Sequence, residues 1–236
     1  MSSFIFDVDG TLTDSRQRID PEFEKFMTEF TSVHTCYICT GSDRDKTVEQ
    51  LGTELTNKFK LAFHCSGNSI YEQDNEIYKS DWQLSNEEKH FLIQQLKKSS
   101  FPKKTGNHLE TRTGTANFSI VGRNADDSQR KLYVDWDTKY DERDYIAYNF
   151  NKLFGTKSQA VVGGDTGIDI FQLGKDKSQI LEHINTVNTT HFFGDKMYEG
   201  GNDFTLGVAI GSLVRGNVYS ITNWQHTYSI LQNFMP

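Results

Sequence analysis

The start of the chain constrains its fold more than any other segment. The apolar run 4–6 (Phe-Ile-Phe) indicates a short buried strand. Asp-Val-Asp-Gly-Thr follows at once at 7–11, and its glycine permits a tight turn. Two carboxylates one residue apart, at the carboxyl end of a buried strand, are unfavourable unless something neutralises them. The chain therefore begins either with a ligand site at a strand end or with an ordinary Asp/Gly turn.

A divalent cation would neutralise this pair of carboxylates. Mg²⁺ takes one or two carboxylates and completes its coordination with water and substrate phosphate. In such a site Asp7 would attack phosphorus as a nucleophile, and Asp9 would serve as the general acid/base. The functional interpretation of this strand end is therefore phosphoryl transfer.

The composition is that of an ordinary soluble protein. Its 236 residues suffice for one large domain or two modest ones, and 36% hydrophobic residues supply a core. The net charge of −7 argues against non-specific binding to nucleic acid. No apolar run approaches the roughly 20 residues of a membrane span, and the first strand begins too early to leave room for a signal peptide. We therefore expect a cytoplasmic protein that binds no membrane.

The three cysteines, Cys36, Cys39 and Cys65, are an odd number. Cys36 and Cys39 lie inside an apolar, strand-like run, which favours buried free thiols. A redox pair or a pair of zinc ligands is the alternative.

A strand–helix–strand unit follows the first motif. Asp20 and Pro21 provide an N-cap and a proline at the first helical position, and apolar residues recur at helical spacing over 23–30. Residues 35–39 then predict a second buried strand. This order indicates a parallel sheet, whose strands gather their carboxyl ends at the edge that binds ligands.

A Thr-Gly-Ser segment at 40–42 opens the next helix, which is expected from Asp43 to about Leu51. Small hydroxyls and backbone N–H groups at a helix N-terminus suit a phosphate, so Ser42 is a candidate substrate-binding residue. The alternative is that this segment only caps the helix.

From about residue 80 the periodicity changes. Ser85 and Glu88 form a capping box, and a later helix is expected over 141–154. Strands are predicted at 109–112, 116–121, 159–162 and 168–171. Antiparallel strands with helices on one face indicate an inserted α+β domain. We therefore expect residues 1–79 and 174–236 to form the catalytic core and residues 80–173 to form a cap.

The core pattern resumes with a helix beginning at Lys177 and a buried strand at 190–193. This strand ends in Gly-Asp-Lys, and a Gly-Gly-Asn-Asp loop follows at 200–203. Because Mg²⁺ takes oxygen ligands from more than one segment, Asp195 is a second metal candidate. Lys177 would neutralise phosphoryl and carboxylate charge.

Three arginines stand out in the cap: Arg112, Arg123 and Arg130. Arg112 and Arg123 are expected at the two ends of one strand. A guanidinium can clamp a phosphate with two N–H groups, so the three are candidate phosphate ligands. Solubilising surface charge is the alternative.

The order of these motifs resembles the haloacid dehalogenase-like superfamily. The matching segments are 7–11, 40–42, Lys177 and 194–196. The resemblance implies an α/β fold with a Rossmann-like, doubly wound parallel sheet as its core and an inserted α+β cap. It implies Asp7, Asp9 and Lys177 as catalytic residues, with Asp7 phosphorylated during the reaction. It also implies an Mg²⁺ site that involves Asp7, Asp9 and Asp195.

A closer resemblance, to the eukaryotic-type phosphomannomutases, covers nearly the whole chain. The matching segments are 7–13 with 16–17, 117–123, 129–130, 163–164, 168–171, 176–177, 192–196 and 200–203. The phosphosugar ligands that this resemblance implies are Arg16 from the core and Arg112, Arg123, Arg130 and Asp169 from the cap. Gly167 departs from the family, whose members carry serine there.

The resemblance implies a homodimer, joined through its caps, that interconverts mannose 6-phosphate and mannose 1-phosphate with a hexose 1,6-bisphosphate as activator. Glucose phosphates are further expected substrates, and GDP-mannose biosynthesis is the expected pathway. A hexose-phosphate phosphatase is the second hypothesis, because both activities use the same catalytic motifs. A non-catalytic phosphosugar-binding module is the third, and the presence of Asp7, Asp9, Lys177 and Asp195 disfavours it.

Overall fold

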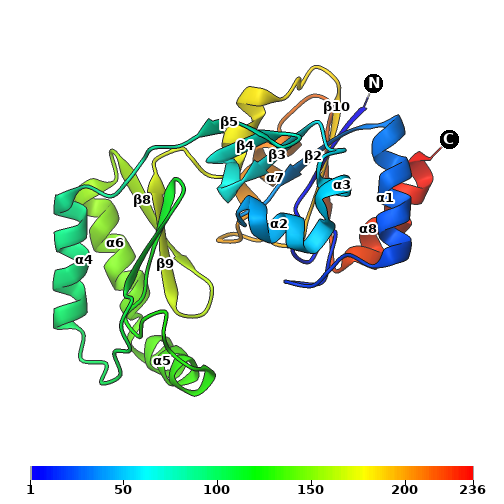
Figure 1. The fold of residues 1–236 in the computed structure, drawn as a ribbon. Coiled ribbons are helices and arrows are strands. Elements are labelled where there is room, and N and C mark those ends of the chain that lie inside the picture. Colours follow the sequence, from blue (N-terminus) through cyan, green and yellow to red (C-terminus); the bar gives the residue numbers. More distant parts are fainter. Residues whose placement is uncertain (1, 236) are drawn as a thin grey trace. The chain divides into compact units, whose positions relative to one another are not determined.

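The computed structural model describes residues 2–235, which form two compact units (Figure 1). One unit holds the chain up to Lys79 and again from Gly174 onward, and we call it the core unit. The other is Ser80–Leu173, which we call the cap unit.

The core unit is built on a seven-stranded sheet. In spatial order its strands are β11 (Gly216–Ser220), β10 (Thr189–Gly194), β1 (Ser2–Phe6), β2 (Thr35–Cys39), β3 (Leu61–His64), β4 (Ser69–Glu72) and β5 (Asn75–Lys79). The first five are parallel to one another, β4 pairs antiparallel with β3, and β5 pairs antiparallel with β4. The chain runs outward from β1 in both directions. This strand order confirms the predicted doubly wound α/β core.

Helices cover both faces of this sheet. They are α1 (Pro21–Val33), α2 (Arg44–Leu51), α3 (Thr53–Thr56), α7 (Phe204–Gly211) and α8 (Trp224–Leu231), with short 3₁₀ helices at Cys65–Gly67, Lys177–His183 and Gln232–Phe234. In the described part of the chain, no helix is both long enough and apolar enough to cross a bilayer.

Side chains of β1 alternate between two buried clusters. Phe4 and Phe6 lie in one cluster with Phe30 of α1, and the ring centroids of Phe4 and Phe30 are 4.9 Å apart. Ile5 lies in the other cluster with Ile210 of α7. Because successive strand residues point to opposite faces, β1 is buried from both sides, as its unbroken apolar run predicts.

The cap unit is an α+β structure. Its four-stranded antiparallel sheet has the order β6 (Leu109–Arg112), β7 (Thr115–Phe118), β9 (Gly167–Gln172) and β8 (Ser158–Gly163). The helices are α4 (Asn86–Lys98), α5 (Asp127–Tyr140) and α6 (Glu142–Phe154). Leu92, Tyr133 and Phe150 from these helices form one buried cluster with Phe118 and Ile170 of the sheet.

Some elements differ from the predicted ones. Helix α5 was not predicted, because only Tyr133 and Asp137 are buried along its 14 residues and the apolar spacing is weak. The strand predicted over 116–121 is Thr115–Phe118, and the helix predicted from Lys177 is a 3₁₀ helix.

Cys36 and Cys39 on β2 are buried free thiols, as predicted. Burial raises the pKa of both thiols well above its ordinary value. Because the thiolate is the reactive form, these two cysteines are packing residues.

The predicted capping box at the start of α4 leads to a prediction about the stability of that helix. The Glu88 N–H donates to Ser85 Oγ at 3.3 Å, and the Ser85 N–H donates to Glu88 Oε2 at 2.7 Å. Ser85→Ala should therefore lower the free energy of unfolding of α4 by about 1 kcal/mol, measured by hydrogen exchange of its amides. Ser100→Ala, at an exposed residue beyond the helix, is the control. Equal effects of the two variants would contradict this role of the capping box.

Candidate active site

The carboxyl ends of adjacent parallel strands bring the predicted catalytic residues together. Asp7 directly follows β1, and its backbone N–H donates to the Phe193 carbonyl of β10 at 2.9 Å. Asp195 directly follows β10, and Thr40 directly follows β2. This is the edge at which open α/β sheets bind ligands.

A buried lysine lies at the centre of this edge. Lys177 Nζ is 2.6 Å from Asp7 Oδ1 and 2.7 Å from Asp203 Oδ1. The side chains of Lys177, Asp7 and Asp203 are 0%, 4% and 0% exposed. Burial disfavours the ammonium, but the two carboxylates outweigh burial and hold the pKa of Lys177 above its ordinary value. Lys177 is therefore a fixed cation.

Lys177 does not balance all the negative charge beside it. Asp195 adds a third carboxylate, and one oxygen from each of Asp7, Asp195 and Asp203 lies within 4.8 Å of the others. Burial raises the pKa of Asp7 to about 7 and also raises the pKa of Asp195. One lysine thus leaves three clustered carboxylates incompletely neutralised, and a further cation would stabilise their ionised forms.

Two observations show that this cluster fits a divalent cation. Asp195 Oδ1 is buried and accepts no hydrogen bond from residues 2–235. Gly10, with φ of +80°, lies so close to the same carboxylate that a Cβ would be 2.5 Å from Asp195 Oδ2. Only glycine suits that conformation and that approach. Clustered carboxylates with an unpartnered oxygen are a donor set suited to Mg²⁺.

Asp9 has a different set of partners. Its Oδ1 accepts from the Arg16 backbone N–H at 2.7 Å and from Gln50 Nε2 at 3.0 Å. Its Oδ2 accepts from Ser42 Oγ at 3.4 Å and lies 3.7 Å from Lys46 Nζ. Burial raises the pKa of Asp9, but these bonds and charges outweigh burial and lower it. The Asp9 carboxylate lies outside the three-acid cluster, so its role at a metal stays a prediction.

Arg16 and Ser42, the core residues predicted to bind substrate, are both neighbours of Asp9. Arg16 is exposed and has a left-handed backbone with φ of 61°. The Ser42 N–H donates to Thr40 Oγ1 at 3.1 Å, and its hydroxyl reaches Asp9. Their roles in binding stay predictions.

Asp203 was not assigned a role from the sequence. Its Oδ1 contacts Lys177, and its Oδ2 accepts from the Lys196 backbone N–H at 3.1 Å. The Gly-Gly-Asn-Asp segment was a visible signal. It did not show that Asp203 would join Asp195 beside Asp7, because that depends on how the loop folds back.

Gln50 is a second residue of the site that was not assigned a role, and unlike Asp203 it has no sequence signal. It is 2% exposed, and its Nε2 donates to Thr13 Oγ1 at 3.1 Å as well as to Asp9. In the sequence it is one polar residue among several on α2. The structure makes it one of the donors that hold the Asp9 carboxylate.

In the cap unit, two of the three predicted arginines share one carboxylate. Arg112 donates from Nε to Glu110 Oε1 at 3.2 Å and from Nη2 to Glu110 Oε2 at 3.0 Å. Arg123 Nε lies 2.7 Å from the same Glu110 Oε2. Arg112 ends β6, just before β7 begins, and Arg123 lies beyond the end of β7, so the two arginines flank β7 in the chain as expected, although neither belongs to that strand.

The other two predicted cap residues lie on separate elements. Arg130 is on α5 and is half-buried. Asp169 is on β9, and its Oδ1 accepts from Asn117 Nδ2 of β7 at 2.7 Å. Asn117 is also the residue opposite Asp169 in the sheet.

Comparison with known proteins gives a consistent result. A family model described as eukaryotic phosphomannomutase matches residues 23–235. The phosphomannomutase of Spinacia oleracea is 34% identical over 209 residues, which cover 86% of this chain and 84% of that protein. The phosphomannomutase of Arabidopsis thaliana is 33% identical over 210 residues, which cover 86% of this chain and 85% of that protein.

Solved structures share the fold at much lower identity. A haloacid dehalogenase-like hydrolase from Bacteroides thetaiotaomicron has a TM-score of 0.64 at 12% identity, with 99% of both chains covered. A haloacid dehalogenase subclass IIB sugar phosphatase has a TM-score of 0.60 at 16% identity, again with 99% of both chains covered. These likenesses confirm the fold and carry no conclusion about substrate.

The central ion pair leads to a stability prediction. Lys177→Met leaves buried carboxylates without their cation and should lower the free energy of unfolding by about 3–5 kcal/mol in metal-free buffer. Lys175→Met is the matched control, because Lys175 is 30% exposed and lies 3.6 Å from Glu182. The control should lose less than about 1 kcal/mol. Chemical denaturation that gives similar losses for both variants would contradict the account.

Proposed function

The chain belongs to the eukaryotic phosphomannomutase family of the haloacid dehalogenase superfamily, and we propose that it interconverts mannose 6-phosphate and mannose 1-phosphate. Glucose phosphates are further proposed substrates, with a hexose 1,6-bisphosphate as activator. The observation that best supports this proposal is the buried contact of Lys177 with Asp7, beside Asp195 and Asp203. It combines a carboxylate nucleophile, a fixed cation and a candidate cation site.

Asp7 is the proposed nucleophile. Its Oδ1 contacts Lys177, so Oδ2 is the oxygen that attacks phosphorus while the bond from phosphorus to the sugar oxygen breaks. Lys177 offsets the charge that develops on the transferring group. Asp7, Asp195 and Asp203 would hold Mg²⁺, which when bound supplies further positive charge to the phosphoryl oxygens.

Asp9 is the proposed general acid and base. Arg16 and Gln50 donate to its Oδ1 at 2.7 and 3.0 Å, whereas its Oδ2 has only the longer contacts with Ser42 and Lys46, so Oδ2 is the oxygen proposed to give the proton to the departing sugar oxygen. In the other half of the reaction, Asp9 takes a proton from the free hydroxyl of a hexose monophosphate while that hydroxyl attacks the phosphorus on Asp7. The bond from phosphorus to Asp7 breaks, which restores the Asp7 carboxylate and forms the bisphosphate, and the bisphosphate then reorients so that its other phosphate faces Asp7.

The cap residues are proposed to bind the part of the substrate that is not reacting. Arginines at positions 112, 123 and 130 would bind its second phosphate with paired N–H groups. Asp169 would accept hydrogen bonds from sugar hydroxyls, and Arg16 and Ser42 would contribute from the core. Charge-based contacts suit a mutase, because its bisphosphate must bind in two orientations.

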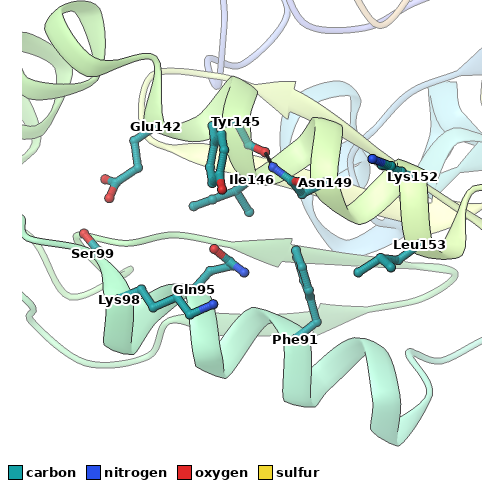
Figure 2. Close-up of a pocket in the computed structure, with 10 residues that line it drawn as sticks. All are labelled: Phe91, Gln95, Lys98, Ser99, Glu142, Tyr145, Ile146, Asn149, Lys152 and Leu153. Atoms are coloured by element: carbon teal, nitrogen blue, oxygen red, sulfur yellow. Dashed lines mark hydrogen bonds between the residues drawn. The ribbon is translucent and has the colours of Figure 1, made fainter.

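A homodimer joined through the caps is the proposed assembly. A groove of about 520 Å³ lies between α4 and α6, where Phe91 and Gln95 face Tyr145 and Ile146 (Figure 2). Tyr145 and Leu153 are 64% and 63% exposed. Exposed aromatic and aliphatic surface of this kind is typical of a protein–protein interface. From the family we also propose a cytoplasmic location and a role in GDP-mannose biosynthesis.

Replacing the nucleophile tests the chemistry. Asp7→Asn removes the attacking carboxylate, so turnover of hexose phosphate should fall about 10³-fold or more while the protein stays folded. Asp14→Asn, an exposed aspartate of the same loop, should turn over like the unchanged protein. Near-normal turnover by Asp7→Asn would remove Asp7 from its proposed role.

Product analysis tests the activity itself. Mannose 1-phosphate should be converted to the 6-phosphate in the presence of Mg²⁺, faster with catalytic amounts of glucose 1,6-bisphosphate, and a chelator should abolish the conversion. Slow release of inorganic phosphate should accompany it, because water competes for the phosphoryl group on Asp7. If inorganic phosphate is the main product at every bisphosphate concentration, the enzyme is instead a hexose-phosphate phosphatase.

A further inference from the structure

A row of polar side chains crosses one face of the cap sheet. The strand register pairs Glu110 of β6 with Asn117 of β7, and Asn117 with Asp169 of β9. Phe118 and Ile170, the next residues along β7 and β9, lie in the cluster formed with the helices. Because strand residues alternate between faces, the polar row lies on the face opposite that cluster.

Glu110 is the member of this row that contacts two cations. Its Oε2 lies 3.0 Å from Arg112 Nη2 and 2.7 Å from Arg123 Nε, and its Oε1 accepts from Arg112 Nε. The hydrogen bonds from Arg112 hold the pKa of Glu110 below its ordinary value, although partial burial opposes them, and the charge of Arg123 adds to the effect. Glu110 is therefore ionised at neutral pH.

The way in which Arg123 meets Glu110 leaves its phosphate-binding edge available. A guanidinium can present either its Nε–Nη edge or its Nη1–Nη2 edge to an oxyanion. Arg123 Nε is the nitrogen that lies 2.7 Å from Glu110 Oε2, which engages the Nε side of the guanidinium. In the proposed clamp, the two terminal nitrogens donate to the phosphate while Nε stays with Glu110.

We propose that Glu110 is a positioning residue that holds Arg112 and Arg123 together as a two-guanidinium clamp for the phosphate of a hexose phosphate. This inference rests on the proposed function, in which both arginines bind phosphate. Nothing in the sequence marks Glu110 for this role, because its neighbours are set by the register of β6 and β7 and by the turn that carries Arg123.

Two physical effects give Glu110 this role. Two guanidinium groups that approach one carboxylate oxygen repel each other, and the carboxylate between them offsets that repulsion. The side chains of Arg112 and Arg123 are also 43% and 31% exposed, and a contact that orders them before the ligand binds reduces the conformational freedom that binding removes. Removing Glu110 also removes a negative charge near the phosphate. Removing that charge would favour phosphate binding, but solvent and salt screen the effect because these side chains are partly exposed. The loss of order in the two arginine side chains therefore has the larger effect on affinity.

Calorimetric titration with glucose 1,6-bisphosphate, in buffer with Mg²⁺ and the full chain, tests the proposal. Glu110→Gln keeps the shape and removes the charge, so the Kd should rise roughly tenfold, the cost of ordering two long side chains anew. Asp135→Asn is the matched control, because it removes an acid from the cap's exposed Lys131–Asp135 pair on α5. Its Kd should stay within about twofold of the unchanged protein. Unchanged or tighter binding by Glu110→Gln would overturn the proposal.

A double-mutant cycle separates positioning from a general effect on cap folding. If Glu110 acts through the two arginines, then Glu110→Gln should change the Kd by less than about twofold in an Arg112→Ala/Arg123→Ala background. A tenfold loss that persists in this background would show that Glu110 acts elsewhere.

The Arg112→Ala/Arg123→Ala variant also separates the role of Glu110 from the proposed function. If Arg112→Ala/Arg123→Ala binds the bisphosphate as tightly as the unchanged protein, the proposed phosphate-binding role of the arginines fails. If that variant binds weakly while Glu110→Gln binds normally, only the role of Glu110 is overturned.

Discussion

The core unit depends on one buried contact, that of the Lys177 ammonium with the carboxylates of Asp7 and Asp203. These residues come from three segments: the end of β1, the 3₁₀ helix after the cap, and the residue before α7. Burying such charges is costly unless all partners are present, so the contact forms only when both halves of the core unit have assembled. Hydrophobic clusters on both faces of the sheet hold the strand ends in register around it.

Asp7 and Asp9 are one residue apart, yet the fold gives them opposite surroundings. Asp7 is buried beside other carboxylates, and burial raises its pKa to about 7. Asp9 accepts hydrogen bonds from Arg16 and Gln50, which outweigh its burial and lower its pKa. Carboxylates whose environments differ in this way can take different roles in one reaction. The proposed assignment of nucleophile to Asp7 and proton carrier to Asp9 rests on position and not on this pKa difference, because Asp7 contacts Lys177 inside the three-carboxylate cluster and Asp9 lies outside that cluster.

Local patterns predicted the parts of this structure that are determined locally. The run 4–6 predicted β1, Asp20 with Pro21 predicted the start of α1, and the Ser85 capping box predicted the start of α4. Helix α5 was not predicted, because it has too few buried residues to give the sequence an apolar helical face. Contacts between distant parts of the chain were not predicted: Asp203 returns to Lys177, and Arg123 meets Glu110 across the β6–β7 hairpin.

Identification of the phosphorylated residue tests the central claim most directly. The chain would be mixed with hexose 1,6-bisphosphate and Mg²⁺, quenched in acid within one turnover, digested and analysed by mass spectrometry. The account predicts one phosphoryl group, on the peptide that contains Asp7 and on the Asp7 side chain itself. A phosphoryl group on another residue, or turnover without any phosphorylated peptide, would contradict it.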